Sequence, residues 1–334
     1  MQFCSEIMQI IHWCLLSLIV IGVYFKGSYG GIWNIWDLSY WRCVLKKYYQ
    51  CPDNDIRYYM YTPHTGTKRI IIDVRNRYSL EYSNFDPDKK NVLIIHGFNG
   101  TESRSPITIL RNAFLSTKKY NIFTVDWSPI THFPCYVSAL SNTRIVGQCA
   151  AKLYSFIMNN GGIATETTCI GHSLGAHICG MISNHLTKKQ HKIVGLDPAR
   201  PLINEFANPT FRLTQDDAYQ VQVIHTNAGF LGEINQVGHV DFCVNGGRFQ
   251  PSCYGHRLRR ARCSHFQSAC YYAQTVKFGN SIMGRPCTAK CPKTTSNWGL
   301  LPGKPIPMGE QTPFGIRGTY CVQTDTKRDC PFFQ

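Results

Sequence analysis

The segment Gly171–Gly175 places a serine, Ser173, between small residues in a G-x-S-x-G pattern. A short apolar run ends at Ile170 just before it, and an apolar pattern with helical spacing continues after it to Leu186. Glycines at these two positions allow a tight strand-to-helix turn that exposes the serine hydroxyl. The N–H groups at the start of the helix would then stabilise an oxyanion, so the segment predicts a nucleophile for acyl transfer.

A serine hydroxyl needs a neighbouring base, and the base needs an acid to orient it. Asp197 follows the apolar run Ile193–Leu196, which places its carboxylate at the strand end where the nucleophile is expected. His265 lies late in the chain, where the order Ser-Asp-His places the base. Twelve histidines leave other candidates, four of them at strand ends or turns, where hydrogen-bonded structural histidines are more common: His96, His172, His225 and His239.

Five short, β-branched runs are expected to form the buried strands that carry these residues: Asn91–His96, Ile122–Asp126, Thr168–Ile170, Ile193–Leu196 and Val221–His225. Apolar residues at helical spacing predict a helix over 145–157, which Gly161 and Gly162 would end. This alternation predicts an α/β fold with a mostly parallel sheet covered by helices. The proline-rich part from Cys270 onwards is expected to form cysteine-pinned loops of the same domain, ending in the apolar stretch Gly318–Val322.

The composition is that of a globular protein of 334 residues, which excludes intrinsic disorder, collagen and a multi-span membrane protein. The chain has 35 Lys and Arg against 20 Asp and Glu, a net charge of +15. This excess favours anionic partners such as phospholipid surfaces, sulfated glycans or nucleic acid. Sixteen cysteines without zinc-binding spacing indicate disulfides and an oxidising compartment.

The N-terminal region carries an apolar run, Ile10–Phe25, that is shorter than the roughly 20 residues of a membrane-spanning helix. Ser28 and Gly30 form a small-x-small pattern. Residues 1–30 are therefore predicted to be a signal peptide, with an uncleaved signal anchor as the alternative. Either reading places the rest of the chain in the lumen or outside the cell, and the glycosylation sequon at Asn99 agrees with this.

The blocks GHSLGAH, GLDPARP and CSHFQS resemble the three active-site blocks of the pancreatic lipase family. The resemblance extends from Cys51 to Ser281 and includes four further runs: Ile94–Phe98, Val125–Trp127, Ile224–Asn227 and Gly238–Gly247. It implies that residues 31–334 form a single lipase-like α/β-hydrolase domain. It also implies Ser173 as nucleophile, Asp197 as acid and His265 as base. The backbone N–H groups of Phe98 and Leu174 would form the oxyanion hole, which agrees with their places after a strand end and after the nucleophile.

The resemblance further implies a lid closed by a disulfide between Cys253 and Cys263. Only residues 254–262 lie between them, too few for a helix of useful length over an acyl cleft. Lipases acting on triglyceride usually have longer lids, so the short lid, with a short loop over 227–237, resembles insect and venom phospholipases A1. The lid carries four arginines that could bind lipid phosphate, or simply form a solvated basic loop: Arg257, Arg259, Arg260 and Arg262.

Two departures from the family pattern concern metals and partners. The family's calcium site uses a carboxylate where this chain has Thr214, within the stretch Asn208–Asp217, so we predict no metal and no cofactor. We expect no C-terminal lipid-binding sandwich, and hence no colipase-type partner.

The resemblance suggests a disulfide between Cys51 and Cys135. Three cysteines could equally be buried thiols: Cys149, Cys169 and Cys179. Six are expected to pair among themselves in an order that the sequence leaves open: Cys243, Cys270, Cys287, Cys291, Cys321 and Cys330.

These observations predict a secreted serine esterase that hydrolyses the sn-1 acyl ester of phospholipids at a lipid interface, in peripheral contact with an anionic membrane surface. The alternatives are a triacylglycerol or galactolipid lipase of the same fold, and a non-catalytic lipase-like lipid-binding or storage protein. The last is disfavoured because Ser173 is present. Specific nucleic-acid binding is not expected, because only the net charge would support it.

Overall fold

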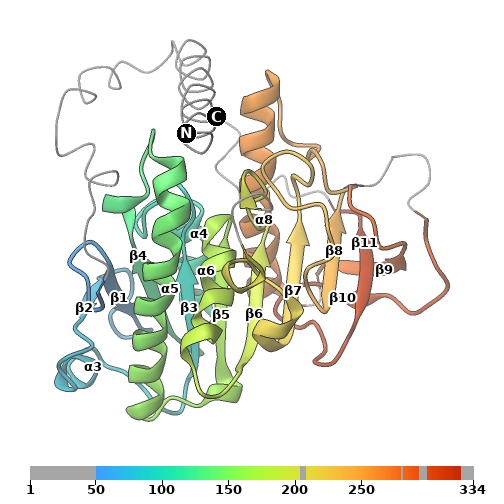
Figure 1. Cartoon of the computed structure of the whole chain (residues 1–334). Coiled ribbons are helices and arrows are strands. Elements are labelled where there is room, and N and C mark those ends of the chain that lie inside the picture. The colour runs from blue at the N-terminus through green and yellow to red at the C-terminus, as the bar shows by residue number, and fades with distance from the viewer. Residues whose placement is uncertain (1–49, 204–207, 280, 293–298, 325–334) are drawn as a thin grey trace, which may run out of the picture.

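The computed structural model describes residues 50–203, 208–279, 281–292 and 299–324. Their strands form one eleven-stranded sheet in the order β10-β9-β11-β8-β7-β6-β5-β3-β4-β1-β2 (Figure 1). The predicted signal peptide, residues 1–30, lies outside the described residues. Within these ranges, no helix combines the length and the apolar character needed to cross a bilayer.

The centre of the sheet is parallel and consists of β3 (Lys90–Ile95), β4 (Tyr120–Asp126), β5 (Thr167–His172), β6 (Gln190–Leu196) and β7 (Ala218–His225). Each contains most or all of one predicted apolar run, which confirms the α/β prediction. Continuous apolar runs are typical of parallel strands that are covered on both faces. Because these strands are parallel, their carboxyl ends meet at one edge, which is the upper edge in Figure 1.

Six further strands extend the sheet on both sides: β1 (Arg57–Tyr61), β2 (Ile70–Ile72), β8 (Val240–Val244), β9 (Met283–Cys287), β10 (Ile306–Pro307) and β11 (Gly318–Val322). The expectation that the chain after Cys270 forms only loops is therefore wrong. Cys270 itself lies in a helix, and β11 pairs with β8 in parallel and with β9 antiparallel. This proline-rich segment forms strands because it pairs with other strands of the sheet, although its own sequence has no strand-like alternation of apolar residues.

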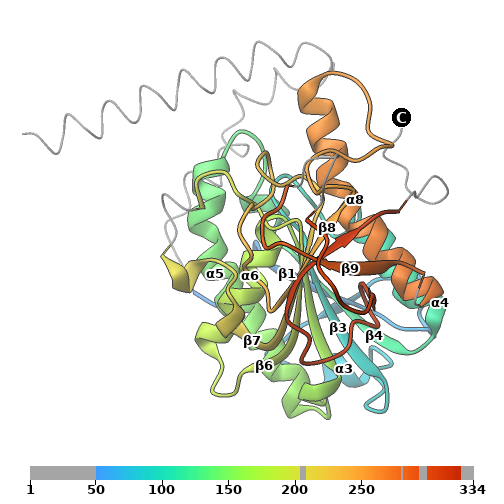
Figure 2. The same ribbon diagram turned by 90° about the vertical axis from the view of Figure 1, so that its right-hand side faces the viewer.

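Helices cover both faces of the sheet, as Figure 2 shows from the side. On one face lie α5 (Tyr136–Asn159) and α6 (Leu174–Ile182), and on the other α4 (Ile107–Thr117) and α8 (Arg257–Phe278). A short helix, α3 (Tyr78–Glu81), follows β2. The predicted helix over 145–157 lies within α5, and Gly161 follows it with a φ of 100°. The buried apolar side chains form two main clusters, one between the sheet and α5 and α6, the other between the sheet and α4 and α8.

Five disulfides lie within the described residues: Cys51–Cys149, Cys169–Cys179, Cys243–Cys291, Cys253–Cys263 and Cys287–Cys321. The expected pairing of Cys51 with Cys135 is wrong. Cys51 packs against the middle of α5, 5.2 Å from Cys149 between Cα atoms, whereas Cys135 precedes this helix and is bonded to another cysteine. Cys149, Cys169 and Cys179 are disulfide-bonded and are not thiols.

Candidate active site

Ser173 occupies a sharp turn between β5 and α6, with φ 59° and ψ −121°. The flanking glycines are required by space: a Cβ atom on Gly171 would lie 2.1 Å from the carbonyl oxygen of Gly175, and one on Gly175 would lie 2.1 Å from that of Ile95. The N–H of Ser173 donates to the carbonyl of Leu196 at 3.1 Å, which ties the turn to the end of β6. The turn thus holds a side chain that is 9% exposed at the carboxyl edge of the sheet.

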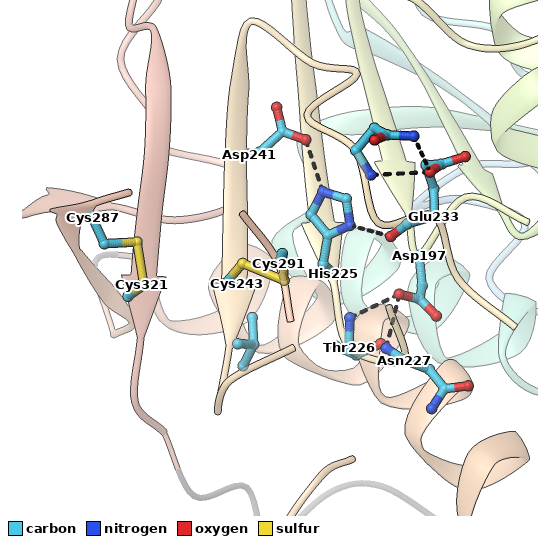
Figure 3. The surroundings of a disulfide bond; sticks show 12 residues. Asp197, His225, Thr226, Asn227, Glu233, Asp241, Cys243, Cys287, Cys291 and Cys321 are labelled. Atoms are coloured by element: carbon cyan, nitrogen blue, oxygen red, sulfur yellow. Dashed lines mark hydrogen bonds and ion pairs between the residues drawn. A yellow bond between two sulfur atoms is a disulfide. The ribbon is translucent and has the colours of Figure 1, made fainter. Parts of the chain in front are cut away.

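Asp197 follows β6 directly and is completely buried. Its Oδ1 accepts hydrogen bonds from the backbone N–H groups of Thr226 at 2.8 Å and Asn227 at 2.9 Å (Figure 3). Its Oδ2 lies 2.6 Å from Nδ1 of His265. With Nδ1 donating to the carboxylate, a neutral His265 keeps Nε2 unprotonated, as a general base requires.

His265 lies in α8 and its ring packs 4.6 Å, between centroids, from that of His172, the residue before Ser173. Nε2 of His172 donates to the backbone carbonyl of His265 at 3.1 Å. Burial and the charge of His265 hold the pKa of His172 well below its ordinary value, so this ring stays neutral. His172 therefore fixes the backbone that carries His265 through this hydrogen bond.

The loop after β3 lies against Ser173. A Cβ atom on Gly97 would be 2.6 Å from Cβ of Ser173 and 3.1 Å from its Oγ, so Phe98 lies one residue from this contact. The Phe98 ring packs edge-on against Tyr136, with centroids 5.0 Å apart. Leu174 is the first residue of α6, where the N–H has no acceptor within the helix. Phe98 thus adjoins the residue that approaches Ser173, Leu174 follows Ser173 directly, and their role as an oxyanion hole stays a prediction.

His96 holds the same loop through its contacts with Trp127. Its Nε2 accepts from the backbone N–H of Trp127 at 3.0 Å, and its carbonyl accepts from the Trp127 indole at 2.9 Å. The two rings also stack, with centroids 5.5 Å apart. This histidine is a satisfied structural residue, as its position at a strand end predicts.

Cys253 and Cys263 are bonded to each other, and only residues 254–256 of the segment between them are non-helical. Residues 257–262 form the first turns of α8, with the His256 side chain accepting from the N–H of Arg259. We expected no helix of useful length within nine residues, but these turns are helical because α8 continues past Cys263 and cooperative extension stabilises its start. Figures 1 and 2 show these turns projecting beyond the carboxyl ends of the strands.

The four arginines of this segment are exposed, and three lie over aromatic rings. The guanidinium carbon is 4.4 Å from the ring centroid of Phe230 for Arg257, 4.6 Å from Phe249 for Arg260 and 5.4 Å from Phe266 for Arg262. Arg259 lies beside Gly255. Cations at a helix N-terminus add to the positive end of the helix dipole, so the start of α8 is strongly electropositive.

The stretch compared with the family's calcium site ends in a local hydrogen-bond motif. The carboxylate of Asp217 accepts from the N–H of Thr214 at 2.7 Å and forms a capping box with it. Across the residues with described coordinates, no group of three or more His, Cys, Asp and Glu side chains is placed to hold a metal ion. The absence of a metal in the working protein stays a prediction.

The loop after β7 supplies contacts that sequence reasoning missed. Thr226 and Asn227 hold Asp197 through backbone N–H groups, which any residue type could provide. Gly232 lies so close that a Cβ atom there would be 2.5 Å from both carboxylate oxygens of Asp197. The matching run Ile224–Asn227 was a signal that this loop belongs to the site, but it gave these residues no role.

The Lipase family model matches residues 39–296 of the chain. Pancreatic lipase-related protein 2 of Mus musculus is 32% identical over 259 residues, 71% of this chain and 53% of that protein. Lipase member H of Oryctolagus cuniculus is 31% identical over 267 residues, 76% of this chain and 57% of that protein. Phospholipase A1 of Vespula maculifrons is 32% identical over 248 residues, 67% of this chain and 81% of that protein.

This chain therefore spans about half the length of the pancreatic lipase-related and H-type relatives and a larger share of the wasp protein. The family match covers most of the chain and includes all three sequence blocks of the site. Its fold and its ester-hydrolase class agree with the geometry described above. The chain belongs to the lipase family.

Proposed function

We propose that the protein is a secreted phospholipase A1 in which Ser173, Asp197 and His265 form the catalytic triad. The observation that carries the proposal is the 2.6 Å hydrogen bond between the buried Asp197 carboxylate and Nδ1 of His265, at the sheet edge that presents Ser173. A buried carboxylate bonded to a histidine orients a general base, and the strained turn supplies the nucleophile.

In the proposed reaction, Oγ of Ser173 attacks the sn-1 ester carbonyl while Nε2 of His265 takes the proton from the Ser173 hydroxyl. The N–H groups of Phe98 and Leu174 stabilise the oxyanion. Collapse of the tetrahedral intermediate transfers the proton from His265 to the departing alcohol, which leaves as a lysophospholipid. Water, deprotonated by the same histidine, then hydrolyses the acyl-enzyme and releases the fatty acid.

The choice of phospholipid rests on the Cys253–Cys263 segment and on the relatives. Nine residues separate the two cysteines, and the exposed Arg257 and Arg260 lie at the start of α8. Guanidinium groups bind phosphate oxygens in a planar, bidentate geometry that a triglyceride cannot use. The chain also covers 81% of a relative named phospholipase A1. The competing proposal is a lipase of the same fold that acts on triacylglycerol or galactolipid.

The same end of α8 supports contact with an anionic membrane surface. Tyr254 is 74% exposed and Leu258 50% exposed beside the arginines, so apolar and basic groups occur together there. Such a combination favours binding to an interface that is both apolar and negatively charged. The apolar run Ile10–Phe25 and the disulfides of the described residues support secretion.

The substrate is tested by comparing fatty-acid release from phospholipid, triglyceride and galactolipid dispersions, with the Ser173→Ala variant as the blank. Serine-dependent release from phospholipid, at a rate at least tenfold above the other two, is expected. Faster release from triglyceride or galactolipid would reject the phospholipase assignment.

The membrane contact is tested by sedimentation with vesicles of neutral and of anionic phospholipid. Each basic residue near an anionic surface contributes about 1 kcal/mol, so replacing both Arg257 and Arg260 by Gln should weaken binding to anionic vesicles by about 30-fold. Arg77→Gln is the matched control, because Arg77 is also exposed and also lies over a ring, that of Tyr78, but it directly precedes α3. Equal effects of the double variant and the control would contradict the proposed surface.

A further inference from the structure

A second histidine–carboxylate pair lies beside the catalytic acid, as Figure 3 shows. His225, the last residue of β7, places Nε2 2.8 Å from Oδ1 of Asp241 in β8. Its Nδ1 lies 3.0 Å from the backbone carbonyl oxygen of Glu233. His225 and Asp241 are each 1% exposed, so the pair is sealed from solvent.

Both ring nitrogens of His225 face oxygen acceptors, so both can donate only if the ring is protonated. Burial alone would lower its pKa, but the bond to Asp241, the charges of Asp241 and Asp197 and the Glu233 carbonyl together raise it. These contacts favour the protonated ring and hold it from both sides.

The pair is connected to Asp197 through the chain itself. The two residues that follow His225, Thr226 and Asn227, supply the N–H groups that hold Oδ1 of Asp197. Fixing the His225 ring fixes the end of β7 and hence the direction of these two N–H groups.

The loop between the two partners is held in the same way. Asp241 accepts from the N–H of Gly238 through Oδ2 at 3.0 Å, and the N–H of Glu233 donates to the carbonyl of Pro198, next to Asp197, at 2.8 Å. The loop is thus pinned at the His225 end, at the Asp241 end and at its middle.

From this geometry we infer that His225 and Asp241 are positioning residues of the reaction: they hold the backbone cradle that orients the Asp197 carboxylate toward His265. The inference rests on the proposed triad. Fold stability alone is a weak account of the pair, because buried ion pairs are often no more stabilising than well-packed apolar residues of the same size.

The test compares His225→Ala, which removes both ring contacts, with Asp241→Asn, which keeps an oxygen acceptor but removes the charge. The matched control is Glu310→Gln. Glu310 accepts hydrogen bonds from Tyr120 and Tyr272 at 2.7 Å, and Tyr120 begins β4, at the opposite end of the strands from the triad. The readouts are kcat and KM on a water-soluble short-chain ester, and the rate at which a fluorophosphonate labels Ser173.

We expect His225→Ala to lower kcat by about 10²-fold, because misplacing a catalytic group by about 1 Å has an effect of that size. Asp241→Asn should lower kcat by about fivefold to tenfold, since it weakens the charge but keeps the contact. KM should stay within twofold in both variants, and the labelling rate should fall with kcat. Glu310→Gln should leave kcat, KM and the labelling rate unchanged, even where it lowers the melting temperature. A purely structural pair would instead give the same pattern as this control.

The inference is overturned if both variants fold and keep kcat and the labelling rate within twofold of Glu310→Gln. If His225→Ala does not fold, Asp241→Asn decides: a lower kcat at unchanged KM supports the inference and an unchanged kcat overturns it. Failure of the proposed function looks different. Wild-type hydrolysis that Ser173→Ala does not reduce would reject the triad itself, whereas serine-dependent cleavage of the short ester without phospholipid turnover would reject only the substrate.

Discussion

Gly232 gives the sharpest test of how tightly Asp197, the proposed catalytic acid, is held. A Cβ atom at this position would lie 2.5 Å from both carboxylate oxygens of Asp197, about 0.9 Å inside the 3.4 Å at which ordinary contact begins. The φ angle of Gly232 lies outside the left-handed region, so alanine is compatible with the backbone and the effect of Gly232→Ala is purely steric. Either the loop or the carboxylate must move.

The loop resists movement, because the N–H of Gly232 donates to the carbonyl of Asn227 at 3.1 Å and its carbonyl accepts from Gly229 at 2.9 Å. The displacement therefore falls on Asp197, whose three hydrogen bonds include the 2.6 Å contact to His265. A shift of about 1 Å in a catalytic group costs about 10²-fold in rate, and full loss of a triad acid about 10⁴-fold. We expect kcat to fall between these limits, with a destabilisation of about 1–3 kcal/mol from overpacking.

The assay is steady-state hydrolysis of a short-chain ester, with urea unfolding of the same samples. Gly66→Ala is the control: its Cβ would meet nothing within 4 Å, but its φ of +57° makes alanine unfavourable by about 1 kcal/mol. It should lower stability and leave kcat unchanged. A folded Gly232→Ala enzyme with kcat within threefold of wild type would refute the steric argument and the role of Asp197 that it depends on.

Two further predictions concern stability. Burial raises the pKa of Asp217 to about 6. Since the folded state favours the protonated acid, wild-type stability should fall by about 2 kcal/mol as the pH rises from about 4 to above 6, and melts of Asp217→Asn should lack this decline. A decline of equal size in the variant would exclude Asp217 as its source. Replacing both Cys169 and Cys179 by Ala opens a crosslink that spans 10 positions around the nucleophile turn, and should lower the free energy of unfolding in urea by about 2–3 kcal/mol. An unchanged midpoint would show that the crosslink constrains nothing.

The sequence predicts the centre of the fold well, because buried parallel strands are continuous apolar runs that need no partner to be recognised. The run 193–196 lies within β6, and the run 221–225 within β7. By contrast, β9 contains Gly284 and Pro286 and becomes a strand through its pairing with β11. Such tertiary pairing leaves no periodic pattern in the strand itself.

The start of α8 was missed for a related reason. Nine residues are too few for an independent helix, and only the continuation beyond Cys263 makes the helical conformation favourable there. The pairing of Cys51 with Cys149 could not be deduced either, because it depends on which turn of α5 faces the N-terminal segment.

The candidate site, like the fold, was predictable from the sequence only in part. Pattern and resemblance select Ser173, Asp197 and His265, and the structure places the last two in direct contact. The groups that orient Asp197 are backbone N–H donors and a glycine, which carry no chemical signature in a sequence. His225 was expected to be a structural histidine, and only its distances to Asp241 and to the loop indicate a role in positioning.

In the proposed reaction, Ser173 accepts the sn-1 acyl chain of a phospholipid and water then releases it as a fatty acid. The most direct measurement is fatty-acid release from phospholipid labelled separately at sn-1 and sn-2, by the wild-type protein and by its Ser173→Ala variant. The account predicts release of the sn-1 label by the wild type and none above background by the variant. Release of the sn-2 label first, or equal release by both proteins, would contradict it.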